Sequence, residues 1–113
     1  MPVETSAKAV ETRAAAVETS ATIAQWAETT FGPVDSLDVL IDRAQHEIAE
    51  LREALARNAS PSEIAHEAAD ITIFLHRLVA LVGHDLNTAV DEKMSINRQR
   101  RWQLSGDGVG QHI

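Results

Sequence analysis

LDVLIDRAQHEIAELREALARNASPSEIAHEAADITIFLHRLVALV, residues 37–82, contains two helix-forming segments separated by a turn. Apolar side chains recur at three- and four-residue spacing in both segments, which is typical of amphipathic helices. Ser60 suits an N-cap, Pro61 suits the first helical position, and Glu63 completes the pattern of a capping box. We therefore predict helices from residue 36 or 37 to 57 and from 61 to about 82, paired antiparallel through the turn near residues 58–60.

Each predicted helix carries two carboxylates three residues apart, Glu47 and Glu50 in HEIAE and Glu67 and Asp70 in HEAAD. With about 100° per residue, both pairs lie on the flank of the apolar stripe. The residue four positions after each acid is apolar, so none has the basic partner typical of a solvated helix face. Four converging carboxylates repel unless a cation lies among them, and Mg²⁺ or Mn²⁺ prefers oxygen ligands. The spacing favours a divalent-metal site, with a solvated face as the alternative.

Two histidines, His46 and His66, stand directly before an acidic residue. The HExxH helix of zinc proteases needs a second histidine four residues on, which both segments lack. We interpret both histidines as surface residues or as groups behind the metal ligands.

The N-terminal region repeats VETSAKA, VETRAAA and VETSATI, which predicts a helix over residues 1–30 with a narrow stripe of small apolar residues. We interpret it as the first helix of a bundle, with a dimerisation arm as the alternative. Phe31-Gly32-Pro33 is expected to end it near Thr29. The stripe consists of Val3, Val10 and Val17 with Ala7, Ala14 and Ala21.

The C-terminal region predicts a fourth helix, capped by Asp85 and running from Leu86 to about Trp102. The Gly-rich residues 103–113 are expected to form a flexible tail. The fold class predicted from these segments is all-α, a four-helix-bundle-like protomer. Residues 1–102 make one domain, in which residues 37–102 carry the motifs.

The composition limits the classes of function. The 113 residues suit one domain with a small core, which pairing with a second copy would enlarge. Absence of cysteine excludes disulfides and thiolate metal sites, and no segment matches a membrane span or a secretion signal, so we expect a cytoplasmic protein. The net charge of −7 disfavours a nucleic-acid polymer as partner, whereas the local basic cluster near residues 93–101 suits a small anion.

The motifs resemble the MazG-like group of the all-α nucleoside triphosphate pyrophosphatases over residues 37–102. That family has a Glu-Glu-x-x-Glu helix followed by Glu-x-x-Asp, and here His46 replaces the first glutamate of the doublet. A Gly-x-Asp turn and a closing Lys-x-x-x-Asn-x-x-Arg helix follow in the same order. The last motif is matched by Lys93, Asn97 and Arg100.

The resemblance implies metal-dependent hydrolysis of (deoxy)nucleoside triphosphates between the α- and β-phosphates, giving monophosphate and pyrophosphate in nucleotide-pool cleaning. Glu47, Glu50, Glu67 and Asp70 would be the catalytic metal ligands, with Mg²⁺ as cofactor and Mn²⁺ as a possible substitute. The residues expected to bind the substrate are Lys93, Asn97, Arg100 and Arg101, which suit phosphate oxygens, and Trp26, which can stack on a base or simply pack.

Family likeness also implies assembly as a homodimer or homotetramer with a site shared between subunits. A phosphoribosyl-ATP pyrophosphohydrolase-like enzyme is the nearest rival, although the C-terminal half matches it less well. A non-catalytic helical adaptor or regulatory protein is the alternative of a different class. It would tolerate loss of Glu47 and Asp70, whereas the enzyme would not.

Overall fold

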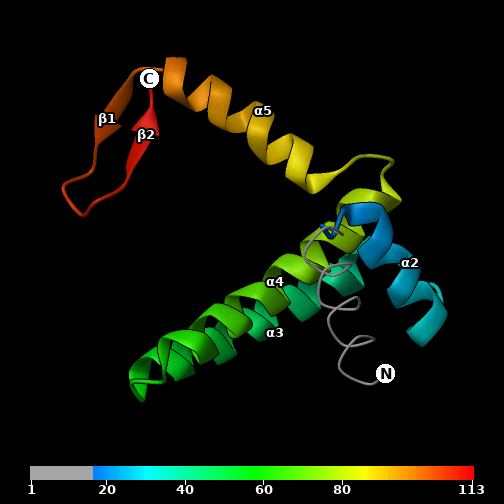
Figure 1. Ribbon diagram of the computed structural model, residues 1–113. Helices are drawn as coiled ribbons and strands as arrows, with labels where there is room; N and C mark the ends of the chain where they lie inside the picture. Colours follow the sequence, from blue (N-terminus) through cyan, green and yellow to red (C-terminus); the bar gives the residue numbers. More distant parts are fainter. Residues whose placement is uncertain (1–16) are drawn as a thin grey trace, which may run out of the picture.

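The computed structural model describes residues 17–113, which form four helices and one β-hairpin (Figure 1). The all-α class predicted from the sequence is confirmed for the body of the chain. The elements are α2 (Ser20–Phe31), α3 (Leu37–Ala56), α4 (Pro61–Leu81), α5 (Leu86–Gln99), β1 (Trp102–Leu104) and β2 (Gly110–His112).

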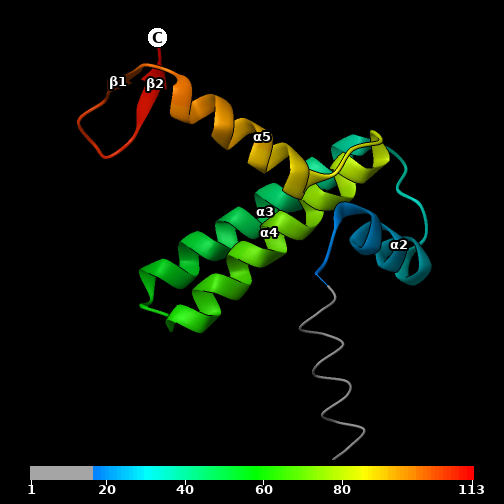
Figure 2. The same ribbon diagram turned by 45° about the horizontal axis from the view of Figure 1, so that its top comes forward.

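A long antiparallel hairpin of α3 and α4 forms the body, and the two helices lie side by side in both views (Figures 1 and 2). Leu40 and Ala44 of the predicted apolar stripe are buried on α3, together with Ala54, whereas other large residues of the stripe remain exposed. Asn58 takes a left-handed conformation, with a φ of 55°, that reverses the chain between the helices. Both helices match the predicted bounds to within about a residue at each end.

The start of α4 differs from the predicted capping box in one respect. The Ser60 hydroxyl accepts a hydrogen bond from the Glu63 backbone N–H at 3.1 Å, as expected of an N-cap. The Glu63 carboxylate forms an ion pair with Arg57, at the end of α3. It therefore ties the two helix ends together.

The N-terminal helix is shorter than the heptad pattern predicts. Thr19 is extended, with φ −124° and ψ 170°, and its hydroxyl caps α2 in a reciprocal capping box with Thr22. A continuous helix through Val17 is therefore wrong, because the Thr19 cap starts a new helix. The remaining heptads fall on residues 1–16, outside the described residues. The predicted stop is confirmed at Gly32, which follows Phe31 with a φ of 83° that favours glycine.

A buried polar cluster joins the starts of α2 and α5 to the C-terminal half of α4. The Ser20 hydroxyl lies 2.8 Å from His76 Nδ1 and accepts the Leu86 backbone N–H at 2.7 Å. The Ser20 backbone N–H donates to the Asp85 carboxylate at 2.9 Å, and Asp85 also caps α5 through Thr88. These hydrogen bonds fix the point at which α5 leaves the body.

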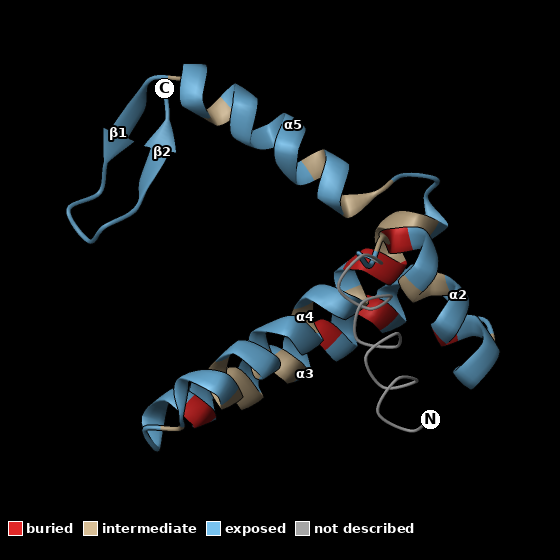
Figure 3. Cartoon of the chain, in the orientation of Figure 1, coloured by how far each residue is buried: buried red, intermediate tan, exposed pale blue. Residues whose placement is uncertain are grey.

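Beyond that point α5 has no buried residue and extends away from the hairpin of α3 and α4 (Figures 1 and 3). The helix ends at Gln99, about one turn earlier than predicted, and residues 102–112 form an antiparallel β-hairpin where a tail without regular structure was expected. Gly106 and Gly108, both with positive φ, make the turn. The indole N–H of Trp102 donates to the Asn97 carbonyl at 2.8 Å, which secures the change from helix to strand.

Large apolar side chains remain exposed on the helices of the body. Ile41 is 40 % exposed, Ile48 45 % and Leu55 54 %, all on α3. A solitary chain therefore leaves much of its predicted core surface in contact with water. Among the described residues, no helix is both long enough and apolar enough to cross a bilayer.

Candidate metal and nucleotide site

Three of the four predicted metal ligands lie together between α3 and α4. Glu47, Glu50 and Glu67 each offer a carboxylate oxygen, and these oxygens lie within 4.8 Å of one another. The three-residue spacing places the first two on one face of α3, and the antiparallel pairing brings Glu67 of α4 opposite them. Asp70 lies outside this tight group, one turn further along α4.

The electrostatics of the cluster are those of crowded like charges. The pKa of Glu47 is raised, first by partial burial and then by the carboxylates of Glu50, Asp70 and Glu67. Asp70 is therefore close enough to act on Glu47. One oxygen of Glu67, Oε2, is buried and has no hydrogen-bond partner among the described residues. Unpartnered, mutually repelling oxygens are a costly arrangement that a bound cation would relieve.

His46 lies beside the cluster on the exposed side of α3. Its Nε2 is 3.4 Å from a Glu50 carboxylate oxygen, with both side chains substantially exposed. The histidine that replaces the first glutamate of the family motif thus contacts one of the candidate ligands.

The donor set fits a hard divalent cation. Every candidate ligand is a carboxylate, and all-oxygen sets suit Mg²⁺ and Mn²⁺ and disfavour zinc. The buried, unpaired Glu67 oxygen supplies an independent observation that points the same way. Glu47, Glu50 and Glu67 would hold the ion, with Asp70 at the edge of the group.

The predicted phosphate-binding residues lie elsewhere in the same chain. Lys93 and Asn97 are on α5, Arg100 is its C-cap, and Arg101 follows in the connection to β1. The cluster lies near the middle of α3 and α4, because Asp70 is about three turns before the end of α4, whereas α5 extends away from these two helices (Figure 1). A single chain therefore does not bring the acidic and basic groups together. Asn97 Oδ1 is buried without a partner among the described residues.

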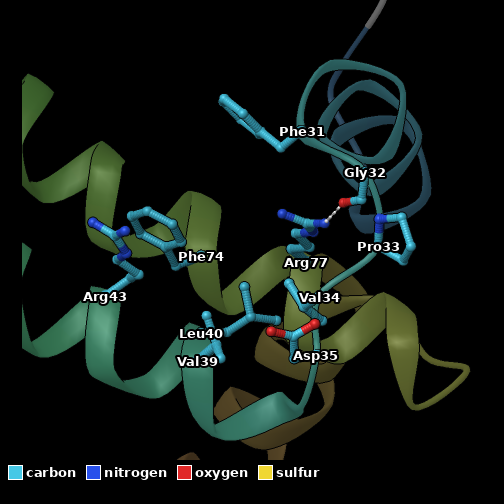
Figure 4. Close-up of a pocket in the computed structure, with 10 residues that line it drawn as sticks. All are labelled: Phe31, Gly32, Pro33, Val34, Asp35, Val39, Leu40, Arg43, Phe74 and Arg77. Atoms are coloured by element: carbon cyan, nitrogen blue, oxygen red, sulfur yellow. Dashed lines mark hydrogen bonds between the residues drawn. The ribbon is translucent and has the colours of Figure 1, made fainter.

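A pocket of about 440 Å³ adjoins the acidic cluster. Arg43 stands four residues before Glu47 on α3, and Phe74 stands four residues after Asp70 on α4, so both lie one turn from the acids on the same helix faces. The volume falls in the range of about 300–1,000 Å³ typical of small-molecule sites. The pocket is lined by residues 31–35 of the α2–α3 connection and by Val39, Leu40, Arg43, Phe74 and Arg77 (Figure 4).

Polar residues of this pocket were missed by the sequence reasoning. Arg77 is only 7 % exposed, and its Nη2 donates to the Gly32 carbonyl at 2.7 Å. The available signal was a single cation within the apolar run FLHRLVALV. Asp35 gave no signal, because its place in the pocket depends on how the α2–α3 connection folds back on α4.

Trp26, the predicted base-stacking residue, is on α2 and is 56 % exposed. Its ring meets Phe31 edge to face, with ring centroids 5.5 Å apart. Phe31 lines the pocket and Trp26 does not. Stacking on a substrate by Trp26 stays a prediction.

Comparisons with known proteins find similar chains among curated proteins and solved structures, while no family model matches. A dATP/dGTP diphosphohydrolase of Salmonella phage PMBT28 is 38% identical over 91 residues, which cover 80% of this chain and 29% of that protein. A dATP/dGTP diphosphohydrolase of Cyanophage S-2L is 38% identical over 55 residues, covering 46% of this chain and 52% of that one. The chain thus spans about half or less of these curated relatives.

A solved structure provides fuller coverage. The Cyanophage S-2L MazG-like pyrophosphohydrolase, bound to dGDP and three catalytic Mn²⁺ ions per active site, superposes with a TM-score of 0.62 and 32% identity. The match covers 83% of this chain and 92% of that one, so it spans nearly the whole of the other protein. On the strength of this match, the chain belongs to the MazG-like pyrophosphohydrolase family.

Proposed function

We propose that this protein hydrolyses purine deoxynucleoside triphosphates at the α–β phosphoanhydride bond, giving a monophosphate and pyrophosphate. The observation that carries the proposal is the convergence of Glu47, Glu50 and Glu67 from two helices within 4.8 Å. Both curated relatives are named for dATP and dGTP, which supports a purine substrate. The cellular role we propose is removal of selected nucleotides from the pool.

The carboxylates of α3 and α4 would hold Mg²⁺, or Mn²⁺ in its place. A bound divalent ion supplies charge neutralisation at the phosphates and makes water a stronger acid. The chain itself supplies fixed positions for its ligands, because each acid is on a packed helix of the body. His46 orients Glu50, and a carboxylate of the group orients or deprotonates the attacking water.

The pocket beside the cluster would receive the nucleoside. Its distance of one helical turn, about 6 Å, from the acids leaves room for the sugar between base and phosphates. Leu40 and Phe74 give it the apolar lining that a base requires.

The working form would be a homodimer or homotetramer in which α5 of a second copy approaches the cluster. The separation of Lys93 and Arg100 from the acids in one chain supports this proposal, as does the exposed apolar surface of α3. The lysine and the arginine would then grip the departing pyrophosphate.

The test is a panel of deoxy- and ribonucleoside triphosphates plus phosphoribosyl-ATP, incubated with Mg²⁺ or Mn²⁺ and followed by phosphorus NMR. We expect monophosphate and pyrophosphate from dATP or dGTP, with no turnover in EDTA or in Asp70→Ala. Asp70 is exposed, so this variant should keep its helical circular dichroism. Diphosphate plus inorganic phosphate would overturn the assigned bond, and an active Asp70→Ala would overturn the role of that carboxylate.

The shared site has its own test. Asp70→Ala and Lys93→Ala/Arg100→Ala should each be inactive alone, and mixing them after unfolding and refolding should restore part of the activity. A mixture that stays inactive, or a chain that remains monomeric by light scattering while active, would contradict the shared site. Full activity of Lys93→Ala/Arg100→Ala would show that these two residues take no part in the reaction.

A further inference from the structure

The pocket one turn from the acidic cluster has a polar wall that neither the metal nor the phosphates require. Asp35 and Arg77 lie on the same side of it, while Phe74 lies on the other (Figure 4). The two charged groups come from different elements, the α2–α3 connection and α4. Asp35 and Arg77 do not form an ion pair with each other.

Arg77 is a buried cation without a counterion in the described part of the chain. It is 7 % exposed, and its one hydrogen bond there is to the neutral carbonyl of Gly32. Its Nε is buried with no partner among those residues. A buried guanidinium that lacks a carboxylate is costly, and the Gly32 bond holds it in one orientation against the pocket.

On the assumption of the proposed function, we propose that Asp35 and Arg77 select guanine among the bases. The edge of guanine presents the N2 amino group, N1–H, O6 and N7 in that order. A carboxylate accepts from the first two groups, and a guanidinium donates to the last two, the pairing that arginine commonly makes with guanine. Neighbouring negative and positive groups on one wall match this donor-then-acceptor sequence.

Adenine fits the same wall less well. It carries no N2 amino group, and its N1 is an acceptor that would face the Asp35 carboxylate. Its N6 amino group would face the Arg77 donors in place of O6. With adenine, two unsatisfied or repulsive contacts therefore replace two charge-assisted hydrogen bonds. A bidentate pair of this kind favours the affinity for the matching base by roughly 5- to 100-fold.

The deciding experiment measures binding of the product nucleotides dGMP, dIMP and dAMP by calorimetry with Mg²⁺ present, so that turnover is not needed. Asp35→Asn is the test variant, because Asp35 is exposed and its change leaves the core intact. Arg77 is buried, and its removal would confound binding with folding. Asp38→Asn is the matched control, since it removes the same charge three residues away, outside the pocket.

Wild-type protein should bind dGMP about tenfold or more tightly than dAMP, with dIMP, which lacks the N2 amino group, in between. Asp35→Asn should weaken dGMP most and bring the three affinities within about threefold, while Asp38→Asn should keep the wild-type order. Equal affinities in the wild type, no binding, or an unchanged order in Asp35→Asn would overturn the guanine assignment. Hydrolysis without base preference would overturn this inference alone, and a guanine preference in binding without hydrolysis would overturn the activity alone.

Discussion

Neutralising Glu47 should stabilise the metal-free protein while removing its response to metal. At the 4.8 Å limit, a like-charge pair costs about 0.9 kcal/mol at the dielectric constant of water and about 3.5 kcal/mol at an effective value near 20. The cluster is partly exposed, so the lower part of this range applies. Relief of the repulsion with Glu50 and Glu67 in Glu47→Gln should therefore raise the free energy of unfolding by about 2 kcal/mol.

Thermal unfolding followed by circular dichroism, in EDTA and in Mn²⁺, measures both effects. In EDTA the variant should melt about 5–10 °C above the wild type, given the size of the chain. In Mn²⁺ at a hundred times its Kd, the wild type should gain about 2.7 kcal/mol by mass action, and the variant much less. Adding the metal should therefore remove or reverse the difference in melting temperature between the variant and the wild type.

The pH dependence has a definite sign. Because the pKa of Glu47 is raised in the folded protein, its carboxylate destabilises the fold at pH values above that pKa and ceases to do so once protonated. The gain in melting temperature that Glu47→Gln gives in EDTA should shrink as the pH falls.

Asp38→Asn is the control, and it should lower stability slightly because Asp38 lies in the first turn of α3. A Glu47→Gln protein that melts below wild type in EDTA, or that keeps the full Mn²⁺ response, would refute the reasoning.

Three further variants test the packing of the fold. Ser20→Ala should cost about 1–3 kcal/mol in urea unfolding, because it leaves buried polar partners unsatisfied, whereas exposed Ser62→Ala should cost little. The pKa of Asp85 is lowered to about 2, chiefly by the backbone N–H groups that donate to its carboxylate. The ionised carboxylate therefore stabilises the fold above about pH 4, and this stabilisation is lost as the pH falls toward 2. Asp85→Asn should flatten that part of the acid-unfolding curve. Arg57→Ala should cost less than about 1 kcal/mol, because its ion pair with Glu63 is exposed, and a larger loss would mean that the pair orders the turn.

The helical body was predictable because its signals are local. Ser60 and Pro61 mark the start of α4, and the apolar spacing indicates the side of α3 on which Leu40 and Ala44 are buried. The same spacing placed Glu47, Glu50 and Glu67 on facing flanks, and the structure brings them together. Periodicity thus gave both the hairpin and the main part of the cluster.

The remaining features depend on contacts between distant segments. Residues 102–112 pair as a β-hairpin through backbone hydrogen bonds that a Gly-rich sequence does not reveal. Asp35 becomes a pocket residue only when the α2–α3 connection lies against α4, and no spacing rule relates it to Arg77. The heptad pattern predicts a helix that continues through Thr19. In the structure Thr19 is extended and forms a reciprocal cap with Thr22, so that α2 begins at Ser20.

The acidic and the basic residues of the proposed site are held in place by different contacts. The candidate metal ligands belong to α3 and α4, which pack against each other within one chain, so we expect metal binding to need no second copy. Lys93 and Asn97 belong to α5, which has no buried residue and which the hydrogen bonds of Ser20 and Asp85 hold to the body near its start. The proposed phosphate contacts therefore depend on the partner that packs against α5. If that partner is a second copy, dissociation should abolish turnover and leave metal binding intact, the separation that the mixing experiment with Asp70→Ala detects.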